Sequence, residues 1–259
     1  MRRTLRALLL TVPLTAQAEP LFMKDMVGDR EFFDPWGVGV DFYTMEQDYG
    51  IKSLEFQLPG VADIDPDLVD VENDLSHVDI KLDAWVTPFL NVFALVGRMK
   101  ADTYVDLSSV ALPPELPFSL GTLEVNYDGT VYGGGFNLFY GTDRWFAALN
   151  NTWTDTSLSG DFESSVQSFT SQPRVGLIRG NWIGYVGAMY LDTEETHSGE
   201  IDLGIPGAPT IPFAVKLDTL EKWNYAIGMG YVFSPKAHLS FEIGLGDRTH
   251  TLFNFTGRF

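Results

Sequence analysis

Alternation of apolar and polar residues over strand-length segments limits what this chain can fold into. Between His77 and Val86 every second residue is apolar, and the residues between them include His77, Asp79, Lys81 and Asp83. Successive side chains of a β-strand point to opposite faces, so this segment has one face with four ionisable groups and one face with none. Such a strand fits a wall with lipid on one side and a polar interior on the other.

Segments of this kind recur along the chain between turn residues. We therefore expect an all-β fold, an antiparallel transmembrane β-barrel of about ten strands, with closure by eight or twelve strands as the alternatives. Short links alternate with long polar or Pro-rich links, as periplasmic turns alternate with external loops in such barrels. An even number of strands puts both ends of the barrel on the periplasmic side. The expected strands cover residues 36–48, 76–87, 92–104, 124–140, 145–157, 165–178, 182–196, 217–233, 237–247 and 250–259.

The N-terminal residues have the parts of a secretory signal peptide. The basic residues of Met1–Arg3 precede a short apolar stretch, and Ala16-Gln17-Ala18 is a cleavage site of the A-x-A type. The apolar stretch is too short for a membrane-spanning helix, which needs about 20 residues. We expect a signal peptide over 1–18, a periplasmic lead-in over 19–35 and a transmembrane barrel over 36–259.

The last nine residues, Thr251–Phe259, form a further alternating strand in which Phe253, Phe255 and Phe259 share one face. An exposed strand edge of this kind invites aggregation unless something covers it. This ending resembles the C-terminal strand of Gram-negative outer-membrane β-barrel proteins, which carries alternating aromatic residues and a terminal Phe. The resemblance implies a location in the outer membrane and contact with its lipids and lipopolysaccharide. It also implies that the barrel-assembly machinery recognises the strand ending at Phe259.

Composition agrees with a barrel and argues against other classes. Without residues 1–18 the chain has 14 Lys and Arg against 35 Asp and Glu, a net charge of −21, whereas nucleic-acid binding calls for basic patches. There is no Cys, so disulfides and thiolate metal sites are not expected. The aromatic content of 14% fits aromatic rows at the two membrane interfaces.

We expect a cluster of charges in the barrel interior. The ionisable face of the 76–87 strand would lie beside charged residues of the next strand, and opposite charges on neighbouring strands stabilise each other. Two interpretations stay open: a salt-bridged core that makes the barrel a closed scaffold, or a constriction that selects small solutes by charge. The expected lumen cluster consists of His77, Asp79, Lys81, Asp83, Arg98, Lys100, Asp102, Arg174 and Glu242.

An acidic stretch between residues 63 and 74 is the one candidate metal site. Asp63, Asp65, Asp67 and Asp70 supply the carboxylate oxygens that Ca²⁺ prefers. The stretch lacks the Gly and the terminal Glu of an EF-hand loop, so a solvated external loop is the alternative interpretation. No other cofactor is expected.

The function expected from these features is non-enzymatic: a porin-like, narrow channel for small solutes, or a barrel with a structural or surface-interaction role. An outer-membrane hydrolase, protease-like or lipase-like, is the alternative, with His77 or His250 acting beside a nearby Asp. No His-x-Ser arrangement on a strand suits a lipase. A carrier of hydrophobic ligands is a further alternative, because the stretches 110–118 and 205–213 are apolar and rich in Pro.

Overall fold

The computed structural model describes residues 19–27, 32–56, 66–109, 121–159, 163–201 and 210–259. These ranges contain eleven strands and two short 3-10 helices, η1 (Lys24–Met26) and η2 (Pro66–Leu68). No helix in these ranges is long and apolar enough to cross a membrane. The strands are β1 (Trp36–Phe56), β2 (Asp70–Thr87), β3 (Leu90–Asp106), β4 (Thr122–Gly141), β5 (Trp145–Ser159), β6 (Glu163–Arg179), β7 (Trp182–Ile201), β8 (Ile211–Thr219), β9 (Trp223–Ser234), β10 (Ala237–Leu245) and β11 (Thr249–Arg258).

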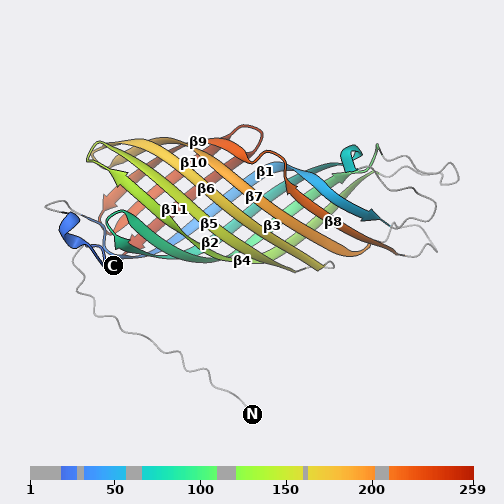
Figure 1. Ribbon diagram of the computed structural model, residues 1–259, viewed down its shortest axis with the longest axis horizontal. Coiled ribbons are helices and arrows are strands. Elements are labelled where there is room, and N and C mark those ends of the chain that lie inside the picture. Colours follow the sequence, from blue (N-terminus) through green and yellow to red (C-terminus); the bar gives the residue numbers. More distant parts are fainter. Residues whose placement is uncertain (1–18, 28–31, 57–65, 110–120, 160–162, 202–209) are drawn as a thin grey trace, which may run out of the picture.

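The strands form a closed antiparallel ring (Figure 1). At the end where β1 begins and the chain stops, ten of the described strands close it, because β11 pairs with β1 from Gly37 to Glu46. Trp36 and Phe259 exchange two backbone hydrogen bonds there. We call this the terminal end and the opposite one the far end. Among the described strands, closure leaves no free edge at the terminal end, and the expected antiparallel barrel is confirmed.

The ring changes its strand number towards the far end. The strands β9, β10 and β11 stop partway along the barrel, and β8 takes their place. It pairs with β1 from Tyr49 to Phe56 and with β7 from Glu194 to Ile201. In the described residues the far section is therefore a ring of the eight strands β1 to β8, with β8 at the right of Figure 1.

The expected single strand over 217–233 is thus two strands, and the sequence pattern explains the break. Inward residues of β8 have odd numbers, such as Leu217 and Thr219, whereas inward residues of β9 have even numbers, such as Asn224 and Ala226. The alternation loses its phase across residues 220–222, so one regular strand cannot present both sets to the lumen.

Buried Arg248 lies at this break, in the turn between β10 and β11. Its guanidinium donates to the backbone carbonyl of Glu221 at 3.2 Å and to that of Met189 at 3.4 Å. Met189 is close to the point where β7 passes from pairing with β9 to pairing with β8. The Arg248 side chain thereby connects the β10–β11 turn to the segment between β8 and β9 and to the neighbouring strand β7.

The outer surface of the terminal section is apolar. Val78, Ile80 and Leu82 of β2 are 44–57% exposed, and the outward residues of the other strands at this level are similar. An apolar surface of this extent would drive aggregation in water, but it is stable against lipid chains. Exposed side chains of this belt include Val38, Phe42, Val92, Val96, Leu138, Val175, Leu177, Val186, Ile227, Met229, Ile243, Leu245, Phe253 and Phe255.

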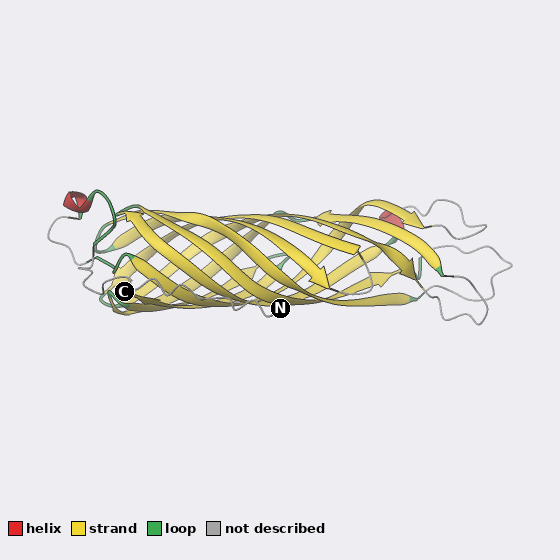
Figure 2. Ribbon diagram, turned by 90° about the horizontal axis from the view of Figure 1, so that it is seen from below, coloured by secondary structure: helices red, strands yellow, loops and turns green. Residues whose placement is uncertain are grey.

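Aromatic residues border this belt on both sides. Trp182 packs on Tyr231 at the terminal end, and Tyr190 packs on Trp223 at the other border, with ring centroids 4.8 and 5.2 Å apart. The strands are steeply inclined to the barrel axis (Figure 2). From Trp182 to Tyr190, a rise of ~3.3 Å per residue and a tilt of about 40° give an axial span of about 20 Å. The roughly 25 Å apolar band of outer-membrane barrels is similar.

Beyond the second aromatic border the outward face becomes charged. On β1 it changes from Phe42 to Glu46, and on β3 it changes from Val96 to Arg98. The far section therefore extends out of the apolar layer into water. In this section β1 continues past residue 48, to Phe56, and β2 begins before residue 76, at Asp70. The link between the two strands is therefore shorter than the one expected over 49–75.

Residues of the lead-in pack against the terminal mouth. The backbone N–H groups of Leu21 and Phe22 donate to the carbonyls of Trp85 and Val86 at 2.9 and 2.8 Å. The ring of Phe33 stacks on Trp85 with centroids 6.3 Å apart. The expected signal peptide and much of the two apolar loops lie outside the described residues.

Candidate functional site

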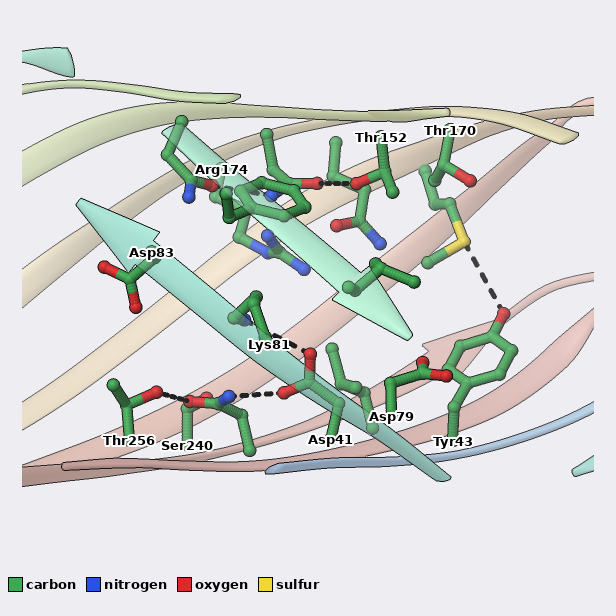
Figure 3. A pocket seen from close by; sticks show the side chains of 18 of the residues that line it. Asp41, Tyr43, Asp79, Lys81, Asp83, Thr152, Thr170, Arg174, Ser240 and Thr256 are labelled. Atoms are coloured by element: carbon green, nitrogen blue, oxygen red, sulfur yellow. Dashed lines mark hydrogen bonds and ion pairs between the residues drawn. The ribbon is translucent and has the colours of Figure 1, made fainter. Parts of the chain in front are cut away.

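An elongated cavity of about 460 Å³ runs inside the barrel and is the candidate functional site. All ten strands of the terminal ring contribute residues to its described wall. Figure 3 shows Asp41, Lys81, Asp83 and Arg174 among the side chains that point into it. A barrel of this size is often filled by its own side chains, so a remaining cavity of this volume indicates room for a small solute.

A band of hydrogen bonds runs around part of the wall near the terminal end. Asn91 donates to Asp83 at 2.6 Å, Asn137 donates to Asn91 at 3.0 Å, and Asn150 donates to Asn137 at 2.6 Å. The three Asn residues are paired in register on β3, β4 and β5. Arg258 of β11 donates to Asp83 at 2.7 Å. This band fixes the orientation of polar groups on five strands of the wall.

A second polar group joins β1, β2 and β11. The ammonium group of Lys81 lies 3.2 Å from Asp41, and Asn254 donates to the same carboxylate (Figure 3). Thr256 donates to Asn254 at 3.2 Å. Lys81 is thus neutralised on the wall and is not a free cation of the cavity.

A buried ion pair crosses the wall between β6 and β10. Arg174 donates to both carboxylate oxygens of Glu242, at 2.7 and 2.9 Å, and Glu242 lies 3.3 Å from His250. Arg174 reaches across β7 and β9, and Gly187 of β7 gives it room, since a Cβ there would lie 2.9 Å from Arg174 Cγ. A bidentate pair with a buried carboxylate holds these strands in one register.

Asp79 differs from the other carboxylates of the described wall. It is 3% exposed, and no hydrogen bond satisfies its Oδ1. Its Oδ2 lies 2.6 Å from Nδ1 of His77, but the contact lacks the angles of a hydrogen bond. Gly97 faces Asp79 on β3, so no side chain covers the carboxylate from that strand. A buried carboxylate without a cationic partner favours a cation or a hydrogen-bond donor in the cavity.

Apolar side chains bound the cavity at both ends. At the far end Tyr49, Val69, Val71 and Leu217 form a buried cluster. At the terminal end the guanidinium group of Arg258 lies over the rings of Phe33 and Trp85, at 5.5 and 5.9 Å from their centroids. Between these two ends the described wall carries both polar groups, such as Asp79, and apolar groups, such as Met99 and Val131.

The expected lumen cluster is divided by the structure. Five residues, His77, Asp79, Lys81, Asp83 and Arg174, line the cavity, and Glu242 is buried in the wall beside them.

The placement expected for Arg98, Lys100 and Asp102 is wrong. All three are exposed on the outward face of β3. They lie in the part of the strand beyond the apolar belt, where the outward face meets water and can carry charge. The charges of these three residues suggest an inward face. However, the outward face of β3 is apolar up to Val96 and charged from Arg98 to Asp102, so charge alone does not identify the lumen side of this strand.

The outward charges of the far section form an acidic surface. Glu46, Asp74 and Asp102 face one another across β1, β2 and β3. Partial burial, together with the charges of Glu46 and Asp102, raises the pKa of Asp74. Asp106 behaves in the opposite way, because hydrogen bonds from Ser108 lower its pKa.

The structure places the expected calcium ligands only in part. Asp63 and Asp65 lie outside the described residues, Asp67 is in η2, and Asp70 is exposed at the start of β2, opposite Asp106. Within the described ranges no three His, Asp or Glu side chains come close enough together to hold a metal ion. Binding of Ca²⁺ by this stretch stays a prediction.

The two histidines considered for catalysis are not placed beside a nucleophile. His250 is fully buried against Glu242, and His77 contacts Asp79 and the ring of Tyr43. Among the described residues, no hydrogen bond joins either imidazole to a Ser or Thr hydroxyl group.

A third histidine, His197, has such a contact, although the sequence favours His77 and His250 over it. Its Nδ1 lies 2.8 Å from the hydroxyl oxygen of Ser164, and its Nε2 lies 3.1 Å from the carboxylate of Glu195. Ser164 and His197 face each other across β6 and β7. The spacing of Glu195 and His197, two residues apart on one face of a strand, is the signal that could have found them.

Comparisons with known proteins identify no family. No protein-family model and no curated protein matches the sequence. An outer membrane channel from Pseudomonas putida F1 is 10% identical over 89% of this chain and 99% of its own, with a TM-score of 0.40. The outer membrane protease OmpT from Escherichia coli is 8% identical over 86% and 94%, with a TM-score of 0.41. The Pseudomonas putida toluene transporter TodX is 10% identical over 86% and 88%, with a TM-score of 0.33.

The chain is an outer-membrane β-barrel. This rests on its own features: a closed antiparallel ring, an outward apolar belt and aromatic residues at both borders of that belt. The similar structures are too distant to assign a role to any residue, so the role of the lumen has to be argued from its geometry.

Proposed function

We propose that the barrel is a narrow conduit for small solutes and that it prefers neutral or cationic solutes to anions. The observation that carries the proposal is the cavity of about 460 Å³, which runs from the terminal ring into the far section and which the side chains of the wall leave unfilled. Its wall combines polar groups such as Asn91 with apolar groups such as Leu95 and Met99. Such a wall suits a small molecule that carries both polar and apolar parts.

The preference for cations follows from the pairing of charges on the described wall. Lys81, Arg174 and Arg258 each contact a carboxylate, at 3.2, 2.7 and 2.7 Å. The carboxylates of Asp79 and Glu195 contact histidines instead. Arg248 is a further buried cation, and its guanidinium donates to backbone carbonyls instead of a carboxylate. In the described lumen the five buried or half-buried carboxylates Asp41, Asp79, Asp83, Glu195 and Glu242 therefore still outnumber the four cations Lys81, Arg174, Arg248 and Arg258. Rings of unbalanced carboxylates favour cations over anions in narrow pores.

The two apolar zones explain how such a conduit would keep solute flow small. A solute has to pass Phe33 and Trp85 at one end and the Tyr49 cluster at the other. Apolar constrictions resist wetting and therefore limit ion flow. We expect low conductance with brief openings and no wide, water-filled pore.

Conductance of the purified protein in planar bilayers under a KCl gradient tests the proposal. The expected result is small, discrete currents whose reversal potential indicates preference for K⁺ over Cl⁻. In Asp79→Asn the preference should weaken, because the buried carboxylate is removed. Asp102→Asn is the matched control, since that carboxylate is exposed on the outer surface, and it should leave the reversal potential unchanged.

Two results would contradict the proposal. Absence of discrete currents over the accessible voltage range would leave the barrel as a scaffold or a ligand carrier. Currents with the same ion preference in Asp79→Asn and the unmodified protein would show that this lumen carboxylate does not control selectivity.

A further inference from the structure

Ser164, His197 and Glu195 form a connected hydrogen-bonded group inside the eight-stranded far section. Ser164 comes from β6, and the other two come from β7. Their side chains are separated by 2.8 Å (Ser164 Oγ to His197 Nδ1) and 3.1 Å (His197 Nε2 to Glu195 Oε2). We propose that this group is a nucleophilic site that cleaves esters with small apolar acyl groups, an activity additional to solute passage.

The hydrogen bonds assign a role to each group. A carboxylate only accepts hydrogen bonds, so the proton of neutral His197 lies on Nε2, which faces Glu195. His197 Nδ1 is then free to accept the hydroxyl proton of Ser164. A nucleophile bonded to a base that a third group orients is the logic of serine hydrolases, here with the two imidazole nitrogens exchanged, since Nδ1 faces the serine and Nε2 the carboxylate.

Contacts around Glu195 hold this arrangement in place. The hydroxyl group of Tyr127 donates to the same Glu195 oxygen at 3.5 Å, and its ring lies 5.5 Å from that of His197. Tyr127 in turn accepts hydrogen bonds from Asn73 at 3.1 Å and Thr103 at 3.2 Å. Glu195 is 4% exposed, so its carboxylate is a buried orienting group for His197.

The surroundings of the pair indicate the class of substrate. On the same inner face Val166 lies opposite Glu195, Val215 lies opposite His197 and Leu217 lies opposite Glu195. An acyl group next to Ser164 would therefore meet aliphatic side chains, which favour short alkyl chains over charged groups. These residues lie beyond the apolar belt, so the substrate would come from water at the far end.

The reaction balances without any further reactant except water. The Ser164 hydroxyl oxygen forms a bond to the ester carbonyl carbon while its proton passes to His197 Nδ1. The tetrahedral intermediate collapses, the bond to the alcohol oxygen breaks, and His197 returns the proton to the leaving alcohol. Water then attacks the acyl group on Ser164 with the same help from His197, which releases the carboxylic acid and restores the serine.

Covalent labelling with a fluorophosphonate tests the nucleophile directly. The serine oxygen displaces fluoride from phosphorus, and mass spectrometry of the intact protein and its peptides locates the adduct. We expect one adduct on Ser164, and none in Ser164→Ala or His197→Gln. Ser168→Ala is the matched control, because Ser168 lies on the same face of β6 but bonds Thr193 at 3.0 Å, and it should label like the unmodified protein.

Hydrolysis of p-nitrophenyl butyrate gives the second readout. General base catalysis contributes about 10²–10⁴-fold, so Ser164→Ala and His197→Gln should lose about 100-fold in rate, whereas Ser168→Ala keeps it. Glu195 acts through His197. We therefore expect Glu195→Leu to abolish labelling and Glu195→Gln, which keeps an acceptor for Nε2, to retain part of it.

Circular dichroism and thermal unfolding show whether each variant is folded before it is assayed. Unlabelled Ser164 in the folded, unmodified protein would overturn the proposal. Equal hydrolysis by the unmodified protein and by folded Ser164→Ala would overturn it as well. Neither outcome concerns Asp79 or ion selectivity, so the conduit proposal stands or fails separately.

Discussion

At the scale of single residues, Arg174 and Glu242 form a buried, bidentate ion pair in the lumen wall. Glu242 is 1% exposed and accepts hydrogen bonds from Arg174, with His250 on its other side. Such a pair adds little net stability over an apolar pair of the same size, but removing one partner strands a buried charge. The pair therefore constrains the register of β6 and β10 more than it strengthens the barrel.

Glu242→Gln should destabilise the barrel by about 3 kcal/mol, because Arg174 keeps its charge without a counter-charge. Urea unfolding in detergent, followed by tryptophan fluorescence, measures the change. The double variant Arg174→Met/Glu242→Leu should lose less stability than Glu242→Gln alone. A double variant that is as unstable as the single one would contradict this account.

The outer row of carboxylates predicts a dependence of stability on pH. The pKa of Asp74 is raised by partial burial and by Glu46 and Asp102, so the folded chain binds this proton more tightly than the unfolded chain. The contribution of Asp74 to stability is therefore present at low pH and is lost as the pH rises through its raised pKa. Asp74→Asn should raise the unfolding midpoint at pH 7, and the gain should vanish below about pH 4, where free carboxyl groups are protonated.

Asp106→Asn is the opposite control. Hydrogen bonds from Ser108 lower the pKa of Asp106, so its ionised form contributes stability at neutral pH that is lost as the pH falls. This variant should lower the midpoint at pH 7. If Asp74→Asn and Asp106→Asn changed the unfolding midpoint at pH 7 in the same direction and by the same amount, the local contacts of these two carboxyl groups would not control their pKa values.

Residue alternation predicts which side chains share a face, but not where along a strand the lipid ends. It put His77, Asp79, Lys81 and Asp83 on one face, and the structure has these four on the cavity wall. The same reasoning put Arg98, Lys100 and Asp102 in the lumen, which is wrong. They lie on the outward face of β3, which meets lipid only up to Val96 and meets water beyond it. The partner of Arg174 was beyond prediction, since Glu242 lies three strands away around the ring.

At the scale of elements, the break between β8 and β9 determines the shape of the barrel. It lets β8 close an eight-stranded ring above the β10–β11 hairpin, within the described residues. The sequence contains the signal for this break in the change of alternation phase across residues 220–222. A search for strands by length alone joins the two segments, as happened with the expected strand over 217–233.

Arg248→Met should weaken this junction. The substitution keeps an unbranched apolar stem, which is shorter than that of Arg, and removes the donors to the carbonyls of Met189 and Glu221. A buried carbonyl group without a donor costs about 1–3 kcal/mol, so we expect a loss of roughly 2 kcal/mol or more. Hydrogen exchange should accelerate around residues 189–191 and 221–224. Arg98→Met, at an exposed outward position, should leave both measurements unchanged.

At the scale of the whole molecule, the barrel has two sections with different surroundings. The terminal section is held in lipid by its apolar belt, and the far section carries its outward charges in water. This division explains how a chain with net charge −18 can form a membrane barrel. Many charged side chains lie on the outer face of the far section, where they meet water. Others point into the lumen, where Lys81, Arg174 and Arg258 pair with carboxylates.

The lead-in contributes a residue to the proposed conduit, because Phe33 lines the cavity at the terminal mouth. Its ring packs on Trp85 and under Arg258, where it narrows the path without forming part of a strand. Phe33→Ala should therefore raise single-channel conductance while it leaves the unfolding midpoint close to that of the unmodified protein. Phe22→Ala is the matched control, since Phe22 is 64% exposed, and it should leave conductance unchanged. If Phe33→Ala conducts like the unmodified protein, the restriction lies at the far end, and substitution of Leu217 in the Tyr49 cluster would then be expected to raise conductance instead.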